Sequence, residues 1–524
     1  MANFNIFTTS TAAQALANGE NGFVGTSGEL VVSSAVAISI GGPSDLAVLG
    51  AVVALDADAV TGPAGSADIS VGETGQIVST GGDGIDLSLT GTITLQNNGL
   101  ISGTSRGVTL AASDGAAGIF LANSGTIQSS SFAINAEAGT GDVTLHNSGL
   151  IETLTSSRAI NFSASGAEII NSGTIIGGVA FSTASGSVLI RNTGTIIGNI
   201  LNFGSGEVDL RGGVVIGVVT GGEGNNIFRI DRSDIDIADF GTTGTDTVFS
   251  SVSFDIASGI ETLVLTGSAD IRGFGGFGDD TLLGNRGDNR LSGGAGNDSL
   301  VGARGDDTLR GGEGNDILSA DEGTDGLRGG AGSDTLLIEG NLSGVVVDLV
   351  KGTASGDITD DDLLESIENV IGGSTNDRII GNVEANRLEG RNGDDTLLGG
   401  TGNDTLTGGL GSDSLNGGQG ADSFVYLNDD PSAPTAIDVI TGFLAGTDII
   451  DLRAIDADLA LGGDQAFSFG GVNFLALGQG SVRVFQDAAN NRTVVELRNA
   501  QDALPDLTIH LTGLLTLTAG DFAL

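Results

Sequence analysis

Glycine and aspartate return at fixed positions in the second half of this 524-residue chain. From Gly275 the sequence contains seven nonapeptides in one unbroken register: GGFGDDTLL, GNRGDNRLS, GGAGNDSLV, GARGDDTLR, GGEGNDILS, ADEGTDGLR and GGAGSDTLL. Six more begin at Gly372: GGSTNDRII, GNVEANRLE, GRNGDDTLL, GGTGNDTLT, GGLGSDSLN and GGQGADSFV. The sixth position is Asp in eleven of the thirteen copies and Asn in two, and the eighth is always Leu, Ile or Phe. A lone copy, GGEGNNIFR, covers residues 221–229.

Each nonapeptide combines a turn, a carboxylate and a short strand. Its glycines permit the positive φ angles of a tight turn, which directs carbonyl oxygens and the sixth-position carboxylate toward one point. An all-oxygen cage of this kind suits a hard cation such as Ca2+. The last three residues form a strand whose eighth-position side chain points inward. Two nonapeptides then make one turn of a parallel roll, and this type of repeat is a known calcium-binding β-helix unit. The sequence therefore predicts multiple Ca2+ ions between loops i and i+2.

The candidate calcium ligands lie at position six, along two edges of each block of repeats. In the first block, Asp280, Asp298, Asp316 and Asp334 are expected along one edge, and Asn289, Asp307 and Asp325 along the other. In the second block, Asp377, Asp395 and Asp413 are expected to oppose Asn386, Asp404 and Asp422. The number of bound ions stays open, because terminal turns and the two asparagine positions can be weak or empty. The sequence also leaves open whether the two blocks form one continuous roll.

Few side chains are available for catalysis. The chain has two histidines, no cysteine, one lysine, one tyrosine and no tryptophan, and neither His146 nor His510 has metal-ligand spacing or a recognisable nucleophile partner. Paired carboxylates such as Asp306 and Asp307 fall at positions five and six of the repeat, where metal binding accounts for them. Polysaccharide lyases and epimerases on β-helices typically use Arg, Lys, His or Tyr, but residues 1–220 contain four arginines and no Lys or Tyr. We therefore expect no enzyme activity, with such a lyase or epimerase as an alternative.

The charge balance narrows the choice of partners. The chain has 66 acidic and 20 basic residues, a formal net charge of −46. Such a surface repels nucleic-acid phosphates and anionic lipid, so no nucleic-acid binding and no membrane insertion are expected. The longest apolar run, residues 46–55, is too short to span a bilayer. Without cysteine there is no disulfide framework, and the N-terminal residues lack the pattern of a conventional signal peptide.

The first half of the chain has a longer period. An Asn-x-Gly step followed by a strand occurs five times, with its asparagine at Asn97, Asn123, Asn147, Asn171 and Asn192, and ETGQIV extends the series back to Glu73. Short alternating strands lie between the steps. A repeat of this length with three short strands is one coil of a parallel β-helix, so residues 30–220 should form roughly eight coils of such a fold. We expect the asparagines to tolerate a left-handed bend and to stack in a ladder.

The C-terminal half resembles the RTX (repeats-in-toxin) proteins that are exported by type I secretion. Besides the nonapeptides, residues 245–273 are similar to a segment that often precedes such blocks, and residues 345–373 resemble the usual spacer between them. The segments 437–455 and 507–524 resemble the C-terminal domain of serralysin-type metalloproteases. In that family the C-terminus is the export signal and often ends in Asp followed by apolar residues, which here are Asp521 to Leu524.

The resemblance covers residues 221–524 and excludes protease activity, because the HExxH motif of serralysins is missing. It implies export through a type I secretion ABC transporter, with calcium outside the cell driving folding. The Asn-x-Gly coils are similar to the β-helices of bacterial adhesins and autotransporter passenger domains.

These observations predict an all-β chain: a right-handed parallel β-helix, an RTX calcium β-roll and a β-rich secretion domain. The expected segments are an N-terminal cap or assembly arm (1–30), the β-helix (31–220), a β connector (221–274), a calcium block (275–337), a spacer (338–371), a second calcium block (372–425) and the C-terminal type I secretion domain (426–524). The expected function is calcium-dependent self-assembly at the cell surface or in the extracellular matrix, as an S-layer subunit or fibre. A monomeric calcium-stabilised adhesin is the first alternative, and cell-surface polysaccharide is a further candidate partner.

Overall fold

The structure, a computed structural model, is built almost entirely of β-strands. It describes residues 4–17, 19–33, 35–62, 65–114, 117–155, 158–182, 186–201, 204–241, 243–339, 343–356, 361–427, 436–456, 465–471, 480–498 and 507–524. Within these ranges the only helix is the 3-10 turn η1 (Ala519–Asp521). In the part of the chain that the structure describes, no helix is long and apolar enough to cross a membrane. The chain divides into two compact units, Met1–Val264 and Leu265–Leu524.

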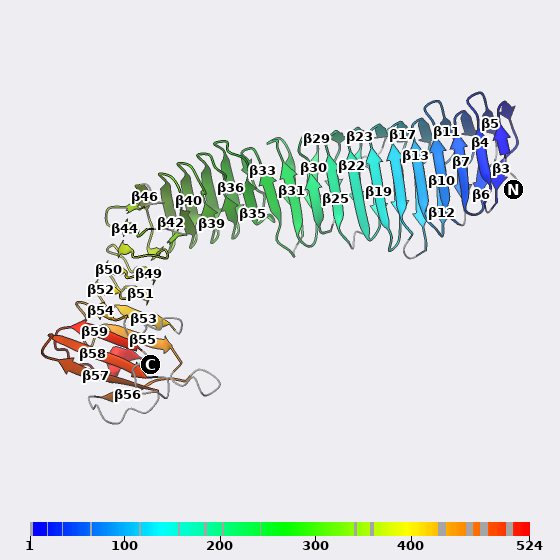
Figure 1. The fold of residues 1–524 in the computed structure, drawn as a ribbon. Coiled ribbons are helices and arrows are strands. Elements are labelled where there is room, and N and C mark those ends of the chain that lie inside the picture. Colours follow the sequence, from blue (N-terminus) through cyan, green and yellow to red (C-terminus); the bar gives the residue numbers. More distant parts are fainter. Residues whose placement is uncertain are drawn as a thin grey trace. The chain divides into compact units, whose positions relative to one another are not determined.

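The first unit is a parallel β-solenoid whose coils contribute strands in turn to three sheets (Figure 1). Its first sheet contains β1 (Phe4–Ile6), β4 (Asn21–Val24), β7 (Ser44–Val48), β10 (Ala67–Val71), β13 (Ile93–Asn97), β16 (Ile119–Asn123), β19 (Asp142–Asn147), β22 (Gly166–Asn171), β25 (Val188–Asn192), β28 (Gly206–Asp209), β31 (Asn226–Ile230) and β33 (Thr247–Ser250). The second sheet runs from β2 (Thr9–Ser10) to β29 (Val214–Ile216), and the third from β3 (Gln14–Leu16) to β32 (Asp236–Asp239). Residues 4–17 and 19–32, in the segment for which a cap or assembly arm is expected (1–30), contain strands that pair in parallel with the following coil, β1 with β4 and β4 with β7.

Alternating side chains fill the interior of these coils. In β13, Ile93 and Leu95 are buried while Thr94 and Gln96 face outward, as the alternating pattern predicts. Leu95 is in register with Ile69 below it and Leu121 above it, so like side chains stack from coil to coil. The glycine of the Asn-x-Gly step is required by the same stacking. A Cβ on Gly125 would lie 2.1 Å from the carbonyl oxygen of Gly99 in the coil below.

The asparagines of the Asn-x-Gly step form a buried ladder at the corner between the first and second sheets. Their Nδ2 atoms donate to the Oδ1 of the next coil over 2.7 Å (Asn97 to Asn123), 2.8 Å (Asn123 to Asn147), 2.7 Å (Asn147 to Asn171) and 2.7 Å (Asn171 to Asn192). The ladder is as expected, but the left-handed bend is not, because no asparagine of the ladder has a positive φ. Glu73 does not belong to the ladder either. The residue in register with Asn97 is Val71, and the corner from Val71 to Gln76 is two residues longer than the corner from Asn97 to Leu100.

Replacing Asn123 with Ala should destabilise the first unit. The change removes one of the acceptors of Asn97 Nδ2 and the amide donor of Asn147 Oδ1, together with the bonds from Asn123 Nδ2 to the carbonyl oxygens of Gly125 and Leu150, and an unsatisfied buried polar group costs about 1–3 kcal/mol. We expect a loss of about 2–4 kcal/mol in the free energy of unfolding, measured by urea denaturation in calcium. Ser124→Ala, at the exposed neighbouring residue, is the matched control and should shift it by at most about 0.5 kcal/mol. Equal effects of the two substitutions would contradict the ladder's role.

The second unit has two facing sheets of parallel strands. One contains β37 (Thr281–Leu283), β39 (Ser299–Val301), β41 (Ile317–Ala320), β43 (Thr335–Ile338), β47 (Asn369–Ile371), β49 (Arg387–Asn392), β51 (Thr405–Leu410), β53 (Ser423–Leu427) and β55 (Ile449–Ala454). The other contains β36 (Arg272–Phe277), β38 (Arg290–Ala295), β40 (Thr308–Glu313), β42 (Gly326–Ala331), β48 (Arg378–Ile380), β50 (Thr396–Thr401), β52 (Ser414–Gln419) and β54 (Asp438–Ile440).

Strand pairing continues between the two blocks of nonapeptides. On one side β47 pairs in parallel with both β43 and β49. On the other side β44 (Val346–Asp348), β45 (Thr353–Ser355) and β46 (Asp362–Glu365) form antiparallel pairs that link β42 to β48. At the C-terminal end, β57 (Ser481–Asp487), β58 (Arg492–Arg498) and β59 (Leu507–Thr512) form an antiparallel sheet. The segment between the blocks therefore adds strands to both sheets.

Candidate calcium sites

Consecutive nonapeptides lie on opposite sheets of the second unit, two to a coil. Strands β37, β39, β41 and β43 begin within alternate copies and lie in one sheet. Strands β38, β40 and β42 begin within the copies between them and lie in the other sheet. The eighth-position side chains point into the space between the sheets, where each is at most 2% exposed from Leu282 to Leu336 and from Ile379 to Phe424. Residues 18 apart are in register, as between Leu291 and Leu309. The structure thus brings the sixth-position residues into the columns that the 18-residue period predicts.

Each column is held together by hydrogen bonds from backbone to carboxylate. The N–H of a position-six residue donates to the Oδ1 of the position-six Asp one coil later, at 2.6–3.0 Å. These donor and acceptor pairs are Asp280 and Asp298, Asp298 and Asp316, Asp316 and Asp334, Asn289 and Asp307, Asp307 and Asp325, Asp377 and Asp395, Asp395 and Asp413, Asn386 and Asp404, and Asp404 and Asp422. One oxygen of each accepting carboxylate is thereby satisfied by the protein.

The second oxygen of these carboxylates is buried without a hydrogen-bond donor. This holds for Oδ2 of Asp298, Asp307, Asp316, Asp334, Asp395, Asp404 and Asp422, side chains that are at most 2% exposed. In each of these copies a Cβ added to the first glycine of the nonapeptide would lie only 2.1–2.4 Å from that Oδ2. The glycine therefore leaves room beside a buried negative charge. A buried carboxylate oxygen without a partner is strongly unfavourable, so this donor set fits a hard cation bound next to Oδ2.

Burial also changes the ionisation of the columns. It disfavours the charged form and raises the pKa of Asp307 and Asp395 to about 7. For the same reason the pKa of Asp298, Asp334 and Asp404 rises to about 6. Neighbouring carboxylates add to the effect, as Asp325 does at Asp307. The protein without calcium thus holds protons that an ion would displace.

The columns extend to acidic residues that lie outside the nonapeptides. The N–H of Asp325 donates to Asp362, that of Asp334 to Glu368, that of Asp413 to Asp438 and that of Asp422 to Asp448, at 2.8–3.1 Å. In the first unit, the N–H of Asn226 donates to Asp246 and that of Asp246 to Glu261. Sequence reasoning missed all six acceptors. Their shared signal is an acidic residue two positions before a buried apolar one, as in Asp448-Ile449-Ile450.

Two further carboxylates, Asp321 and Asp279, lie in the nonapeptide turns at positions two and five. Asp321 replaces the second glycine of its nonapeptide, and burial raises its pKa to about 7. The position-five residue Asp279 accepts the backbone N–H of Asn297 one coil later, so it supports the turn. Among the described residues, no three His, Cys, Asp or Glu side chains converge as a metal-binding group. The backbone carbonyl oxygens of the glycine-rich turn are further oxygen ligands of the kind that a hard cation accepts.

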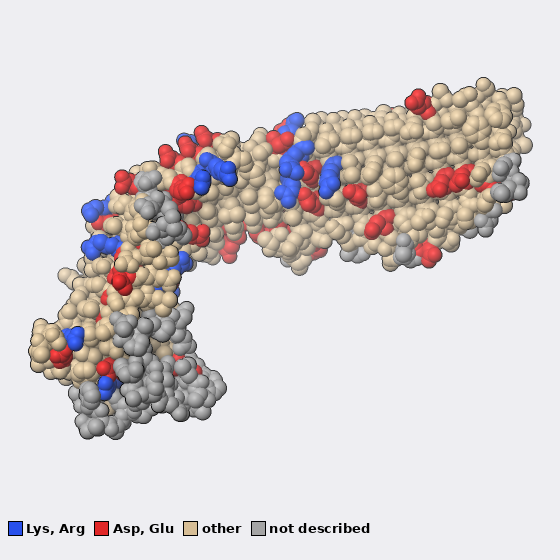
Figure 2. Space-filling view, in the orientation of Figure 1, with Lys and Arg blue, Asp and Glu red and all other residues tan. Residues whose placement is uncertain are grey.

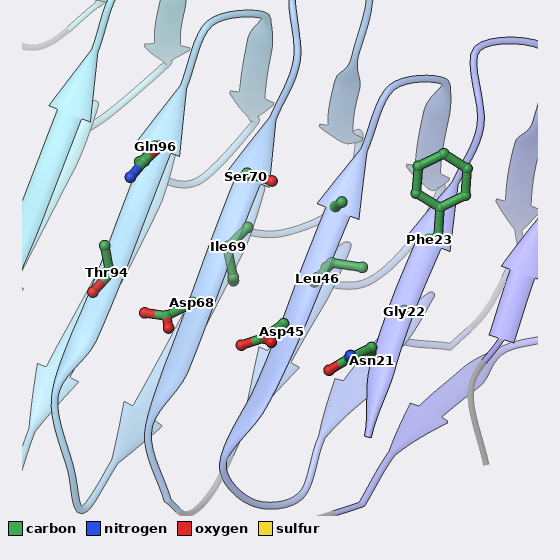
Figure 3. Close-up of a pocket in the computed structure, with 11 residues that line it drawn as sticks. Asn21, Gly22, Phe23, Asp45, Leu46, Asp68, Ile69, Ser70, Thr94 and Gln96 are labelled. Atoms are coloured by element: carbon green, nitrogen blue, oxygen red, sulfur yellow. The ribbon is translucent and has the colours of Figure 1, made fainter. Parts of the chain in front are cut away.

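The first unit has a groove of about 610 Å3 on the outer face of β4, β7, β10 and β13 (Figure 3). Asp45 and Asp68 lie in it on adjacent strands and in register, between Asn21 and Thr94. The other lining residues are Gly22, Phe23, Leu46, Ala47, Ile69, Ser70 and Gln96.

Sequence comparison identifies two families in the second unit. Residues 337–524 match the family described as Peptidase M10 serralysin C terminal. Residues 274–309 and 301–336 match the RTX calcium-binding nonapeptide repeat. Both are non-catalytic domains, and the serralysin-type domain implies export by type I secretion. No curated protein matches the chain.

Several solved structures are similar over part of the chain. The AlgE6R3 subunit of the mannuronan C5-epimerase from Azotobacter vinelandii is 28% identical over 28% of this chain and 78% of its own, with a TM-score of 0.22. The AlgE6R2 subunit of the same enzyme is 27% identical over 30% and 91%, with a TM-score of 0.24. The extracellular lipase LipA from Serratia marcescens is 18% identical over 53% and 45%, with a TM-score of 0.16. TM-scores this low give no basis for transferring an activity.

The family matches and the geometry of the columns agree. The nonapeptides build a parallel roll with buried, cation-fitting carboxylates, and the matched repeat is calcium-binding. Residues 274–524 therefore carry RTX calcium-binding nonapeptide repeats and a serralysin-type C-terminal domain, which identifies the chain as a secreted calcium-binding protein.

Proposed function

We propose that this secreted calcium-binding protein is structural and self-assembles at the cell surface or in the extracellular matrix, as an S-layer subunit or fibre. The observation that carries the proposal is the open end of the first unit, formed by β1, β2 and β3. Among the described residues, each of these strands pairs on one side only, with β4, with β5 (Glu29–Val32) and with β6 (Ile38–Ile40). Unpaired strand edges are templates for another chain.

Backbone hydrogen bonds show which groups face the open side. Gln14 donates its N–H to Ala37 at 2.9 Å, and Leu16 accepts the N–H of Gly41 at 2.7 Å, so both residues bond inward to the next coil. Backbone groups of alternate residues in a strand point to opposite sides. The N–H and C=O of Ala15, which is exposed, therefore face outward. In β1 the carbonyl of Ile6 accepts the N–H of Gly25, so Asn5 faces outward in the same way.

The outer faces of the first unit support close packing of copies. Residues 1–220 contain 16 acidic and 4 basic residues, against 50 and 16 in residues 221–524. On the face shown in Figure 2, charged side chains are few over these coils. Electrostatic repulsion between copies is therefore weakest at the first unit and strongest at the second. Calcium bound to the second unit would neutralise much of that repulsion, which supports calcium-dependent assembly.

The position-six carboxylates are the groups that we assign to calcium. The assignment covers Asp280, Asp298, Asp307, Asp316, Asp325, Asp334, Asp395, Asp404, Asp413 and Asp422. Their support is the column geometry, the buried second oxygen in the members described above and the space beside the first glycine. Calcium would supply the positive charge that these buried oxygens lack.

Electron microscopy and light scattering of the purified protein, in chelator and in millimolar calcium, test the assembly. Asn5→Pro/Ala15→Pro removes two outward N–H groups and keeps the inward hydrogen bonds, because proline is tolerated on an edge strand. We expect wild type to form sheets or filaments in calcium, and the double variant to stay at the monomer mass of 51.9 kDa. Asn5→Ser/Ala15→Ser is the matched control and should assemble.

Each other outcome counts against the proposal. A wild-type protein that stays monomeric in calcium would overturn self-assembly, and saturable glycan binding by that monomer would indicate an adhesin. Assembly of the proline variant at the wild-type level would show that copies meet elsewhere than at β1 and β3.

A further inference from the structure

The two nonapeptides with asparagine at position six also have asparagine at position two. The pairs are Asn285 with Asn289 and Asn382 with Asn386. None of the other eleven copies has asparagine at position two: eight, including that of Gly373, have Gly, and the other three have Ala303, Asp321 or Arg391. The residues one coil earlier in the same column, 266–274 and 363–371, lack the glycine-rich turn in both blocks. The two substitutions therefore occur together and at equivalent places in the two blocks.

Within each pair the two asparagines bond to each other. The N–H of Asn285 donates to Asn289 Oδ1 at 2.6 Å, and Asn289 Nδ2 donates to Asn285 Oδ1 at 3.2 Å. The corresponding distances for Asn382 and Asn386 are 2.7 and 3.2 Å. The position-six oxygen faces the first glycine of its turn, as the aspartate Oδ2 does elsewhere. Here, however, a backbone N–H satisfies it.

The side-chain amide nitrogens of Asn289 and Asn386 donate to backbone carbonyl oxygens of the preceding coil. Asn386 Nδ2 donates to the carbonyl oxygen of Glu368 at 2.7 Å, and Asn289 Nδ2 to that of Ala269 at 3.5 Å. Both acceptors belong to the preceding coil. Asn289 and Asn386 are 1% and 2% exposed. A carboxylate in either place would bring an oxygen against that carbonyl oxygen, so an amide is the side chain that fits.

The backbone at position two distinguishes these turns from copies such as those of Gly294 and Gly312. Gly294 and Gly312 have φ angles of 117° and 129°, and the Oδ2 atoms of Asp298 and Asp316 in these two copies have no hydrogen-bond donor. Asn285, Asn382 and Gly373 do not have positive φ angles. The N–H of Gly373 accordingly donates to Asp377 Oδ2 at 2.7 Å, and Val345 donates to its Oδ1 at 2.9 Å. Asp377 is thus satisfied by two backbone donors.

We propose that the turns of Asn285–Asn289, Asn382–Asn386 and Gly373–Asp377 are calcium-free closures, in which the position-two N–H takes the place of the ion. The inference rests on the proposed calcium assignment of the remaining position-six carboxylates. It removes Asn289, Asn386 and Asp377 from the candidate ligands. Each run of calcium loops then begins next to a turn that folds without calcium, because all of its buried polar groups have partners in the chain.

Counting bound calcium in the full-length protein tests the closures. Elemental analysis after equilibrium dialysis gives the number of ions per chain for wild type, for Asn289→Ala/Asn386→Ala and for the matched control Asp307→Ala/Asp404→Ala. We expect the asparagine variant to keep the wild-type number and the aspartate variant to lose at least two ions. A loss of two ions in the asparagine variant would overturn the closures. A wild-type protein without bound calcium would instead overturn the calcium assignment itself.

Asn386→Asp gives a second readout that does not depend on the alanine variant folding well. In a closure the new carboxylate meets the Glu368 carbonyl oxygen, so the thermal midpoint in saturating calcium should fall, and it should fall less at pH 5 than at pH 8. If Asn386 were a calcium ligand, the added charge would strengthen ion binding and raise the midpoint. A raised midpoint together with tighter calcium binding would therefore contradict the proposal.

Discussion

Removal of calcium by a chelator at neutral pH should unfold the nonapeptide region and leave the first unit folded. A ligand present at 100 times its dissociation constant stabilises the folded state by about 2.7 kcal/mol per site. Four such sites would contribute about 11 kcal/mol, which is comparable with the whole stability of a typical domain, about 5–15 kcal/mol. The buried Oδ2 atoms of the columns then have no counter-charge beside them. The asparagine ladder of the first unit needs no ion, because each of its amides bonds to the next coil.

Limited proteolysis and circular dichroism, with and without chelator, measure this difference. We expect protease cuts within residues 275–425 only when calcium is removed, and a resistant fragment that retains the Asn97–Asn192 ladder. Mg2+ in place of calcium should restore little protection, because it favours a small octahedral shell and keeps its waters. Equal resistance of residues 275–425 in chelator and in calcium would show that the columns are stable without ions.

Without calcium, the second unit should be most stable in mild acid. Burial raises the pKa of Asp307 and Asp395 to about 7, whereas an unfolded chain has Asp pKa values near about 4. The folded state therefore binds more protons than the unfolded state between these values. Its stability is greatest below the unfolded pKa and is lost as pH rises through about 6 to 7, at about 1.4 kcal/mol for each unit of pKa difference. Calcium affinity should change in the opposite direction, because the ion requires the deprotonated carboxylates.

Urea denaturation in chelator at pH 5, 5.5, 6 and 6.5, below the neutral pH at which the nonapeptide region is expected to unfold without calcium, measures this dependence through the transition of the second unit. The midpoint should fall steadily across the series. Asp307→Asn/Asp395→Asn should flatten the fall, because two of the most strongly shifted groups no longer titrate. A wild-type midpoint that stays level or rises with pH would contradict buried, proton-binding columns. The same titration in saturating calcium should show little fall.

Much of the calcium region could be predicted from the sequence, because two nonapeptides have the same length as the 18-residue spacing between residues in register. Nine residues per strand and two strands per coil place Asp298 over Asp280 and Asp307 over Asn289, whatever the variable positions contain. The period fails where the chain inserts other structure. Asp362, the first residue of β46, continues the column of Asp325 although 37 residues separate them, because the antiparallel pair β44 and β45 lies between them in the chain. No local pattern in the sequence gives that distance.

The asparagines show a different limit of sequence reasoning. Residue type alone favoured a left-handed bend at Asn97 and Asn123, but their side chains bond between coils and leave the backbone extended. The partner of each amide lies 21 to 26 residues away, so local propensity does not decide its conformation. At Asn289 the sequence suggested a weak ligand. Its bond to Asn285 emerges only when the turn is seen in three dimensions.

The asparagine ladder also makes the first unit divisible into interchangeable parts. Asn123, Asn147 and Asn171 are separated by the same 24 residues, and each coil contacts only its neighbours, as in other solenoids. Deleting residues 124–147 would join Asn123 to Ser148, the residue that follows the next rung. The amide chain would close over the gap, and the unit would be shorter by one coil. Its length is therefore a whole number of coils that insertion or deletion in a gene can change without designing a new core.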